Sequence, residues 1–206
     1  RRTEGAATLV ILDRLDDPVT PLLSQWTYQA MIHELIGIKN NRVRVQEKGK
    51  AQDIVVSSSG DGFFRDNMYA NYGDLGTSVK RLVDDFQAVS KMNKQIDSIE
   101  DMQRFVESFP EFRQQSGNVS KHVSLMSELS RLIGEHALMA VSQVEQEIVC
   151  GADRAYAFSS TLEKLGDPAV TSTACLKLVL LFALRYEKEG ERQITELQSA
   201  LAKRNV

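Results

Sequence analysis

Apolar residues recur at helical spacing along most of the chain. A run at residues 9–12 is followed by stripes at residues 20–36, 74–90, 99–109, 119–148, 153–165, 174–186 and 193–203. Spacings of three and four residues place such side chains on one face of an α-helix. The pattern therefore predicts a mostly α-helical fold.

Two stretches depart from this spacing and predict β-structure. The four apolar residues 9–12 end at Asp13-Arg14, which is typical of a buried strand leaving a core. Residues 42–46 and 53–57 flank Lys48-Gly49-Lys50 and predict a small β-hairpin. We expect a loop at residues 58–62 after it.

Caps and breakers set the expected helix ends. Thr20 as N-cap, Pro21 at the first helical position and Gly37 as the stop predict one helix over residues 20–36. Trp26 lies in its apolar stripe and is expected to be buried. The stripe at residues 119–148 predicts one long helix, with Gly134 as its weak point.

The stripes at residues 74–90 and 99–109 have matched widths and are joined by polar residues 91–98. This arrangement predicts a projecting antiparallel helical hairpin. Pro110 follows the second stripe, and we expect the helix to bend or end there because proline removes a backbone donor. The helix is expected to restart at residues 116–118.

Composition narrows the class of protein. The 206 residues are 42% hydrophobic and carry a formal net charge of −3, as in an ordinary soluble protein of one or two domains. No basic footprint suggests nucleic acid. The longest apolar run, residues 178–184, is far short of the roughly 20 residues of a spanning helix, so no direct membrane insertion is expected. Cys150 and Cys175 are expected to be buried thiols in a reducing compartment.

Candidate chemistry is sparse. Asp13, Asp16 and Asp17 follow the predicted strand, but a phosphoaspartate hydrolase requires a second Asp where Leu15 stands. We expect Asp13 to pair with Arg14 or another base, and Asp16 and Asp17 to bind backbone amides.

The three histidines offer no metal site. His33, His122 and His136 lie far apart along the chain, with no Cys, Asp or Glu at ligand spacing. Glu145 and Glu147 are expected on a solvated face. The sequence therefore predicts no catalytic residues, no cofactor and no metal, and the protein is not expected to be an enzyme.

The predicted hairpin is the exception, because its tip mixes apolar and polar residues. Met92 and Ile96 stand among Lys91, Asn93, Lys94 and Gln95. Apolar anchors with a polar rim suit recognition of a helix, and a proline hinge allows two shapes. A purely structural hairpin remains open on periodicity alone.

The segment at residues 11–35 resembles the Sec-1/Munc-18 (SM) family. The similarity is carried by Ile11-Leu12-Asp13-Arg14, Asp17-Pro18, Thr20-Pro21-Leu22, Gln25-Trp26-Thr27-Tyr28-Gln29-Ala30-Met31 and His33-Glu34-Leu35. Shorter matches follow at residues 67–69, 105–112, 119–123, 128–132 and 144–147. The resemblance covers about residues 8–206.

This resemblance implies a fold and a role. SM proteins are cytosolic and bind SNAREs, whose zippering into the fusion bundle they chaperone. The resemblance implies that residues 1–19 close the middle α/β domain and that residues 20–206 are an excised helical third domain, with its hairpin at residues 74–110. It also implies a monomer that is cytoplasmic and peripheral to Golgi or endosomal membranes, with a Qa-type syntaxin and an R-SNARE as partners.

The resemblance also implies a set of SNARE-binding residues. They are Lys91, Met92, Lys94, Ile96, Met102, Gln103, Phe109, Val119 and Val123, with Pro110 as the hinge. Two alternatives stay open. One is a structural α-helical domain with no partner site of its own, and the other is a phosphoryl-transfer enzyme built on Asp13.

Overall fold

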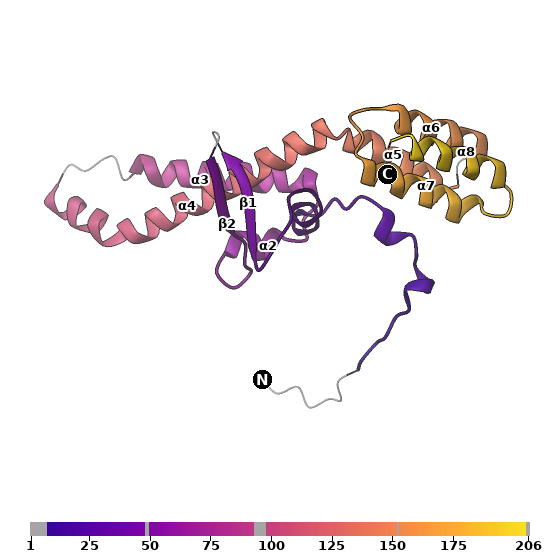
Figure 1. Cartoon of the computed structure of the whole chain (residues 1–206). Helices are drawn as coiled ribbons and strands as arrows, with labels where there is room; N and C mark the ends of the chain where they lie inside the picture. The colour runs from indigo at the N-terminus through magenta and orange to yellow at the C-terminus, as the bar shows by residue number, and fades with distance from the viewer. Residues whose placement is uncertain (1–7, 48–49, 93–97, 152, 205–206) are drawn as a thin grey trace. The chain divides into compact units, whose positions relative to one another are not determined.

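The computed structural model describes residues 8–47, 50–92, 98–151 and 153–204 and is drawn in Figure 1. The chain divides into two compact units, Gln25–Glu135 and Arg1–Ser24 with His136–Val206. Helices dominate both, and the described strands form one small antiparallel sheet. The predicted mostly α-helical fold with a small β-hairpin is confirmed.

The first helix of the unit Gln25–Glu135 is shorter than predicted. A single helix over residues 20–36 was expected, and that prediction is wrong. Thr20–Leu22 form only a 3₁₀ turn, and helix α1 (Tyr28–Met31) continues into a π-helical turn at Ile32–Ile36. Thr27 is extended because it bridges Asn71, and Tyr28 N–H donates to Ala70 O at 3.0 Å. These contacts with a distant segment outweigh local helix propensity.

The helical segment ends at Gly37, as predicted, but Trp26 is less buried than predicted. Gly37 stops the π-helical turn with φ of +98°, a conformation that glycine adopts without steric cost. Trp26 is only half-buried, with its ring edge-on to Tyr72 at 6.3 Å.

The β-hairpin and a short helix follow. Strands β1 (Arg42–Glu47) and β2 (Lys50–Val55) pair with Arg42 opposite Val55. Helix α2 (Gly62–Asn67) was not predicted; it begins where a loop was expected to end, and the Asp61 side chain caps it by accepting Phe64 N–H at 3.0 Å.

The predicted helical hairpin is present as α3 (Tyr72–Met92) and α4 (Ile99–Glu135). The helix does not end at Pro110 and does not restart at residues 116–118 as expected, since α4 runs through both Pro110 and Gly117. Proline removes a single intrahelical hydrogen bond here. The stacked rings of Phe86 and Phe112, 5.2 Å apart, hold α4 against α3 just beyond the proline.

The other unit contains α5 (Leu138–Val149), α6 (Arg154–Gly166), α7 (Ser172–Tyr186) and α8 (Glu191–Ala202). The predicted single helix over residues 119–148 is interrupted, because Ala137 adopts the left-handed region at φ of +49°. The interruption comes three residues after Gly134, the expected weak point.

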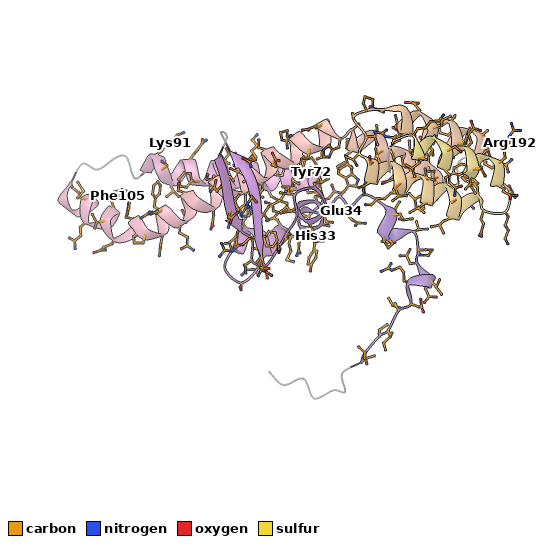
Figure 2. The ribbon with its side chains drawn as sticks, viewed as in Figure 1. His33, Glu34, Tyr72, Lys91, Phe105 and Arg192 are labelled. Carbon is orange, nitrogen blue, oxygen red and sulfur yellow. The ribbon has the colours of Figure 1, made fainter. Side chains whose placement is uncertain are left out.

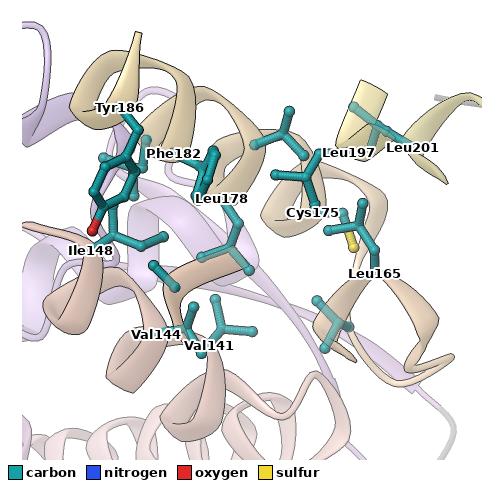
Figure 3. Packing of buried hydrophobic residues seen from close by; sticks show 14 residues of the cluster. Val141, Val144, Ile148, Leu165, Cys175, Leu178, Phe182, Tyr186, Leu197 and Leu201 are labelled. Atoms are coloured by element: carbon teal, nitrogen blue, oxygen red, sulfur yellow. The ribbon is translucent and has the colours of Figure 1, made fainter. Parts of the chain in front are cut away.

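Helix α7 is central to the core of this unit. It contributes the buried residues Cys175, Leu178, Val179, Leu181, Phe182 and Tyr186. Figure 3 labels Cys175, Leu178, Phe182 and Tyr186 of this helix together with Val144, Ile148 and Leu197, which belong to the same buried cluster. Cys150, by contrast, is exposed, because it follows the last turn of α5 rather than its apolar face.

Glu145 was expected on a solvated face but is buried. Its carboxylate accepts hydrogen bonds from Ser24 N at 2.8 Å and Ser24 Oγ at 3.0 Å. This pairing satisfies the buried charge and holds the segment at Ser24 against α5.

The predicted strand at residues 9–12 is absent from the described structure. Leu9 to Leu12 are 70–84% exposed and adopt no regular structure, since no neighbouring strand pairs with them. Asp13 accepts Leu15 N–H rather than pairing with Arg14, whose guanidinium donates to Asp17 O. The Asp17 carboxylate accepts Val19 and Thr20 N–H, as predicted.

Candidate partner-binding surface

The predicted partner-binding residues lie on the helical hairpin of unit Gln25–Glu135. Figure 2 labels Lys91 and Phe105 near its far end. Lys91 is exposed on the last turn of α3. Lys94, Ile96 and the side chain of Met92 fall outside the described residues, so the structure does not test them.

Three large apolar side chains of α4 are exposed on one face of the helix. Met102, Val106 and Phe109 are 51%, 62% and 45% exposed. Their spacing of four and three residues places them side by side along the helix. Val106 was absent from the predicted set, although its spacing from Met102 and Phe109 could have identified it.

Packing with α3 explains why this face stays exposed. Phe112 stacks on Phe86 of α3, and Phe105 is half-buried with its ring edge-on to Phe109 at 5.6 Å. The hairpin therefore closes through the side of α4 that carries Phe112, and Met102, Val106 and Phe109 stay exposed among the described residues.

Val123 extends this surface toward the β-hairpin. It is 41% exposed, whereas Val119 is half-buried. Val123 lines a shallow groove of about 190 Å³ with Val45, Gln46, Ser124, Ser127 and Glu128. We call Met102, Val106, Phe109 and Val123 the outer face; at 1.5 Å per residue it extends over about 30 Å of α4.

Polar groups border the outer face. Gln103 is exposed, and its amide donates to Glu107 Oε1 at 3.4 Å. Beside the groove, Arg131 binds Glu128 through two nitrogens at 2.8 and 2.9 Å and also pairs with Glu135. The Arg131 guanidinium lowers the pKa of Glu128, which therefore stays ionised at neutral pH.

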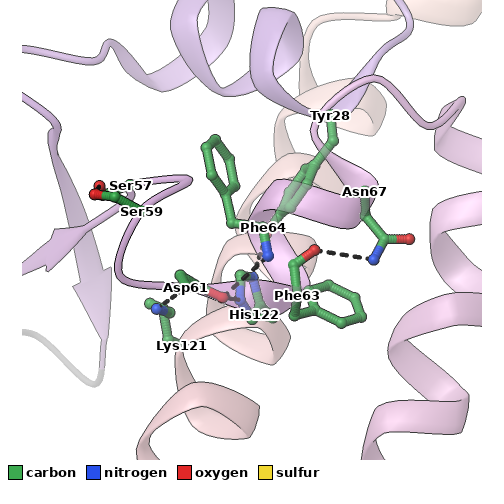
Figure 4. Close-up of polar contacts among 9 residues, drawn as sticks. All are labelled: Tyr28, Ser57, Ser59, Asp61, Phe63, Phe64, Asn67, Lys121 and His122. Carbon is green, nitrogen blue, oxygen red and sulfur yellow. Dashed lines mark hydrogen bonds and ion pairs between the residues drawn. The ribbon is translucent and has the colours of Figure 1, made fainter. Parts of the chain in front are cut away.

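A buried polar network fixes α4 one turn from Val119 and next to Val123 (Figure 4). His122 is fully buried; its Nε2 lies 3.0 Å from Asp61 Oδ2, and its Nδ1 lies 2.9 Å from the Tyr28 hydroxyl. Lys121 also pairs with Asp61. His122 is thus a core residue, in keeping with the absence of ligand spacing around it.

Asp61 is the member of this network that sequence reasoning missed. Burial raises its pKa, but hydrogen bonds from His122, Lys121 and Phe64 N–H outweigh that effect and hold the pKa well below the usual range. Burial, together with the Asp61 charge, raises the pKa of Tyr28, so its hydroxyl stays protonated. The network therefore joins the ionised Asp61 carboxylate to α4 directly, and to α1 through His122.

The described residues gather no three His, Cys, Asp or Glu side chains where they could hold a metal ion. None of the helices in the described part of the chain has the length and apolar content that crossing a bilayer requires. The arrangement instead offers an elongated apolar face on a helix, which suits binding of another helix.

Comparisons with known proteins identify the family to which the chain is similar. The family model described as Sec1 family matches residues 2–205. Vacuolar protein sorting-associated protein 45 homolog from Arabidopsis thaliana is 48% identical over the whole chain, and the human vacuolar protein sorting-associated protein 45 is 44% identical. Each match covers 37% of the relative's own length.

Solved structures are similar as well. The SM protein Vps45 in complex with the Qa SNARE Tlg2 is 45% identical and superposes with a TM-score of 0.88. The match covers 98% of this chain and 37% of that one. The chain therefore spans a little over a third of the length of the proteins that it matches.

Proposed function

The chain belongs to the Sec1 family, as the resemblance predicted, and from this membership we propose that it binds SNARE helices on the outer face of α4 and templates their assembly for vesicle fusion. The observation that carries the proposal is the exposure of Met102, Val106 and Phe109 on one face of the helix. The solved complex of a related SM protein with a Qa SNARE supports the class of partner.

The geometry of the outer face suits an amphipathic helix. Apolar anchors four and three residues apart match the apolar stripe of a partner helix, and the groove beside Val123 can accept one further side chain. Met102 and Val123 are about 30 Å apart along α4, so a partner helix that contacts both needs about 20 residues. SNARE motifs are the partners proposed, from a Qa-type syntaxin and an R-SNARE.

The site of action follows from the same membership. The relatives named as vacuolar protein sorting proteins support a role in protein sorting, and we place the protein in the cytoplasm, peripheral to Golgi or endosomal membranes. Pro110 serves as the hinge of the hairpin in this proposal, and the continuous α4 corresponds to its extended state. No catalytic step is part of the proposal.

The competing function is a structural helical domain whose outer face is covered by other parts of its own protein. It predicts no affinity for SNARE motifs. Binding of Qa-type and R-SNARE motifs to the protein, measured by calorimetry, separates the two.

The decisive variants are Val106→Asp and Val123→Asp, with Val149→Asp as matched control. Val149 lies on α5 and is 39% exposed, against 41% for Val123. We expect each outer-face variant to weaken SNARE binding at least tenfold, about 1.4 kcal/mol, with helicity unchanged. If the native protein does not bind SNARE motifs, or if all three variants bind them equally, the result favours the structural helical domain.

A further inference from the structure

Burial changes abruptly along the helical hairpin. Of the side chains that the structure describes between residues 80 and 121, none is buried. Leu75 and Val79 at the start of α3 are buried, and so are His122, Leu125, Leu129 and Leu132 of α4. We call residues 80–92 and 98–121 the distal hairpin; its boundary on α4 falls between Lys121 and His122.

The contacts within the distal hairpin are correspondingly weak. The Phe86–Phe112 stack joins two half-buried rings, and Phe109 is nearly half exposed. Pro110 removes a backbone hydrogen bond from the same stretch, and Gly117 adds backbone freedom. Segments with few buried contacts open at low free-energy cost, independently of the rest of a fold.

A tight network stands at the boundary. The Asp61 carboxylate accepts Phe64 N–H at 3.0 Å and His122 Nε2 at 3.0 Å, and it pairs with Lys121. It thus joins the first turn of α2 to two consecutive residues of α4. Tyr28 of α1 binds the other nitrogen of His122.

We propose that this network, which we call the Asp61 latch, sets the boundary of a separate conformational unit. The distal hairpin opens and closes as one unit, while α4 from His122 onward stays packed on β1 and the π-helical turn. The latch stops the opening because separating Lys121 and His122 from Asp61 leaves a buried carboxylate without its partners.

The outer face crosses this boundary. Met102, Val106 and Phe109 belong to the distal hairpin, and Val123 to the packed part of α4. If the proposed SNARE binding holds, a helix in contact with both parts closes the distal hairpin, so binding and ordering are coupled. This last step rests on the proposed function, whereas the latch itself does not.

Hydrogen–deuterium exchange of the whole protein tests the latch. In the native protein we expect amides of residues 98–117 to exchange at least 100-fold faster, relative to their intrinsic rates, than amides of residues 125–133. Equal protection along all of α4 would overturn the proposal, because the helix would then open as a single unit.

Substitution at the latch tests its role in setting the boundary. Asp61→Asn should speed exchange at residues 122–128 at least tenfold and leave residues 98–112 unchanged. Asp66→Asn is the matched control, since Asp66 lies on α2, the short helix that Asp61 caps, and is exposed. A boundary that stays at residue 122 in Asp61→Asn contradicts the proposal.

Tyr28→Phe provides a milder variant if Asp61→Asn does not fold. It removes only the hydroxyl that binds His122, and faster exchange should appear at residues 122–125 alone. No change there again contradicts the latch. Added SNARE motif should slow exchange at residues 98–117; failure of that arm, with the boundary in place, counts against the proposed function and leaves the latch intact.

Discussion

Replacing Pro110 with alanine should stabilise the straight form of α4. Pro110 lies inside a helix that runs from Ile99 to Glu135. Its ring nitrogen carries no hydrogen, so the carbonyl of Val106 has no intrahelical donor, and the ring crowds that same carbonyl. Alanine restores the donor and removes the crowding.

The expected gain follows from these two effects. One restored hydrogen bond contributes about 0.5–1.5 kcal/mol, and the whole proline-to-alanine difference in a helix interior is about 3 kcal/mol. The distal hairpin has no buried described side chain, so little packing energy is put at risk by the change. An added 3 kcal/mol corresponds to roughly 100-fold slower opening-dependent exchange.

Hydrogen exchange at residues 103–114 measures this directly. Pro168→Ala is the control, because Pro168 lies in the connection between α6 and α7 and should leave these amides unchanged. SNARE affinity should rise by no more than the same free energy, and by less if the straight form already dominates. Unchanged or faster exchange in Pro110→Ala would refute the reasoning, because the proline would then cost the helix nothing.

Three other predictions concern stability, each measured by urea unfolding. Phe182→Ala removes a fully buried ring from the core around α7 and should cost about 3–5 kcal/mol. Trp26→Ala should cost clearly less than Phe182→Ala, because Trp26 is half-buried; an equal loss contradicts this. Burial raises the pKa of Asp61, but hydrogen bonds from His122 and Lys121 lower it by more, so the folded-state pKa is depressed. The ionised Asp61 therefore stabilises the fold fully above the pKa of an unfolded Asp, about 3.9, and this stabilisation is lost as the pH falls below that value. The native protein should therefore lose more stability than Asp61→Asn between pH 5 and pH 2, and parallel acid profiles would contradict the assignment.

The fold was predictable where local pattern and tertiary packing agree. Helices α3 and α7 follow directly from apolar spacing, and the Thr171 side chain caps α7 by accepting Ala174 N–H. The helix predicted over residues 20–36 failed because Thr27 pairs with Asn71, a contact that local periodicity does not contain. The left-handed Ala137 likewise has no local signal in its own residue type.

The candidate surface was predictable in part for the same reason. Met102, Phe109 and Val123 are exposed on α4, and simple spacing adds Val106. Asp61 could not be foreseen, because its partner His122 is 61 residues away and only the packing of α2 on α4 brings them together. Glu145 and Ser24, separated by 121 residues, are a second such pair.

The central claim is that a SNARE helix lies along the outer face of α4, and site-specific photo-crosslinking tests it most directly. A photoreactive side chain is placed in turn at Met102, at Val123 and, as an exposed control, at Met139 of α5. We predict crosslinks from Met102 and Val123 to one SNARE helix at sites about 20 residues apart, since about 30 Å of α4 separates the two positions. Crosslinks no stronger than those from Met139 would contradict the account.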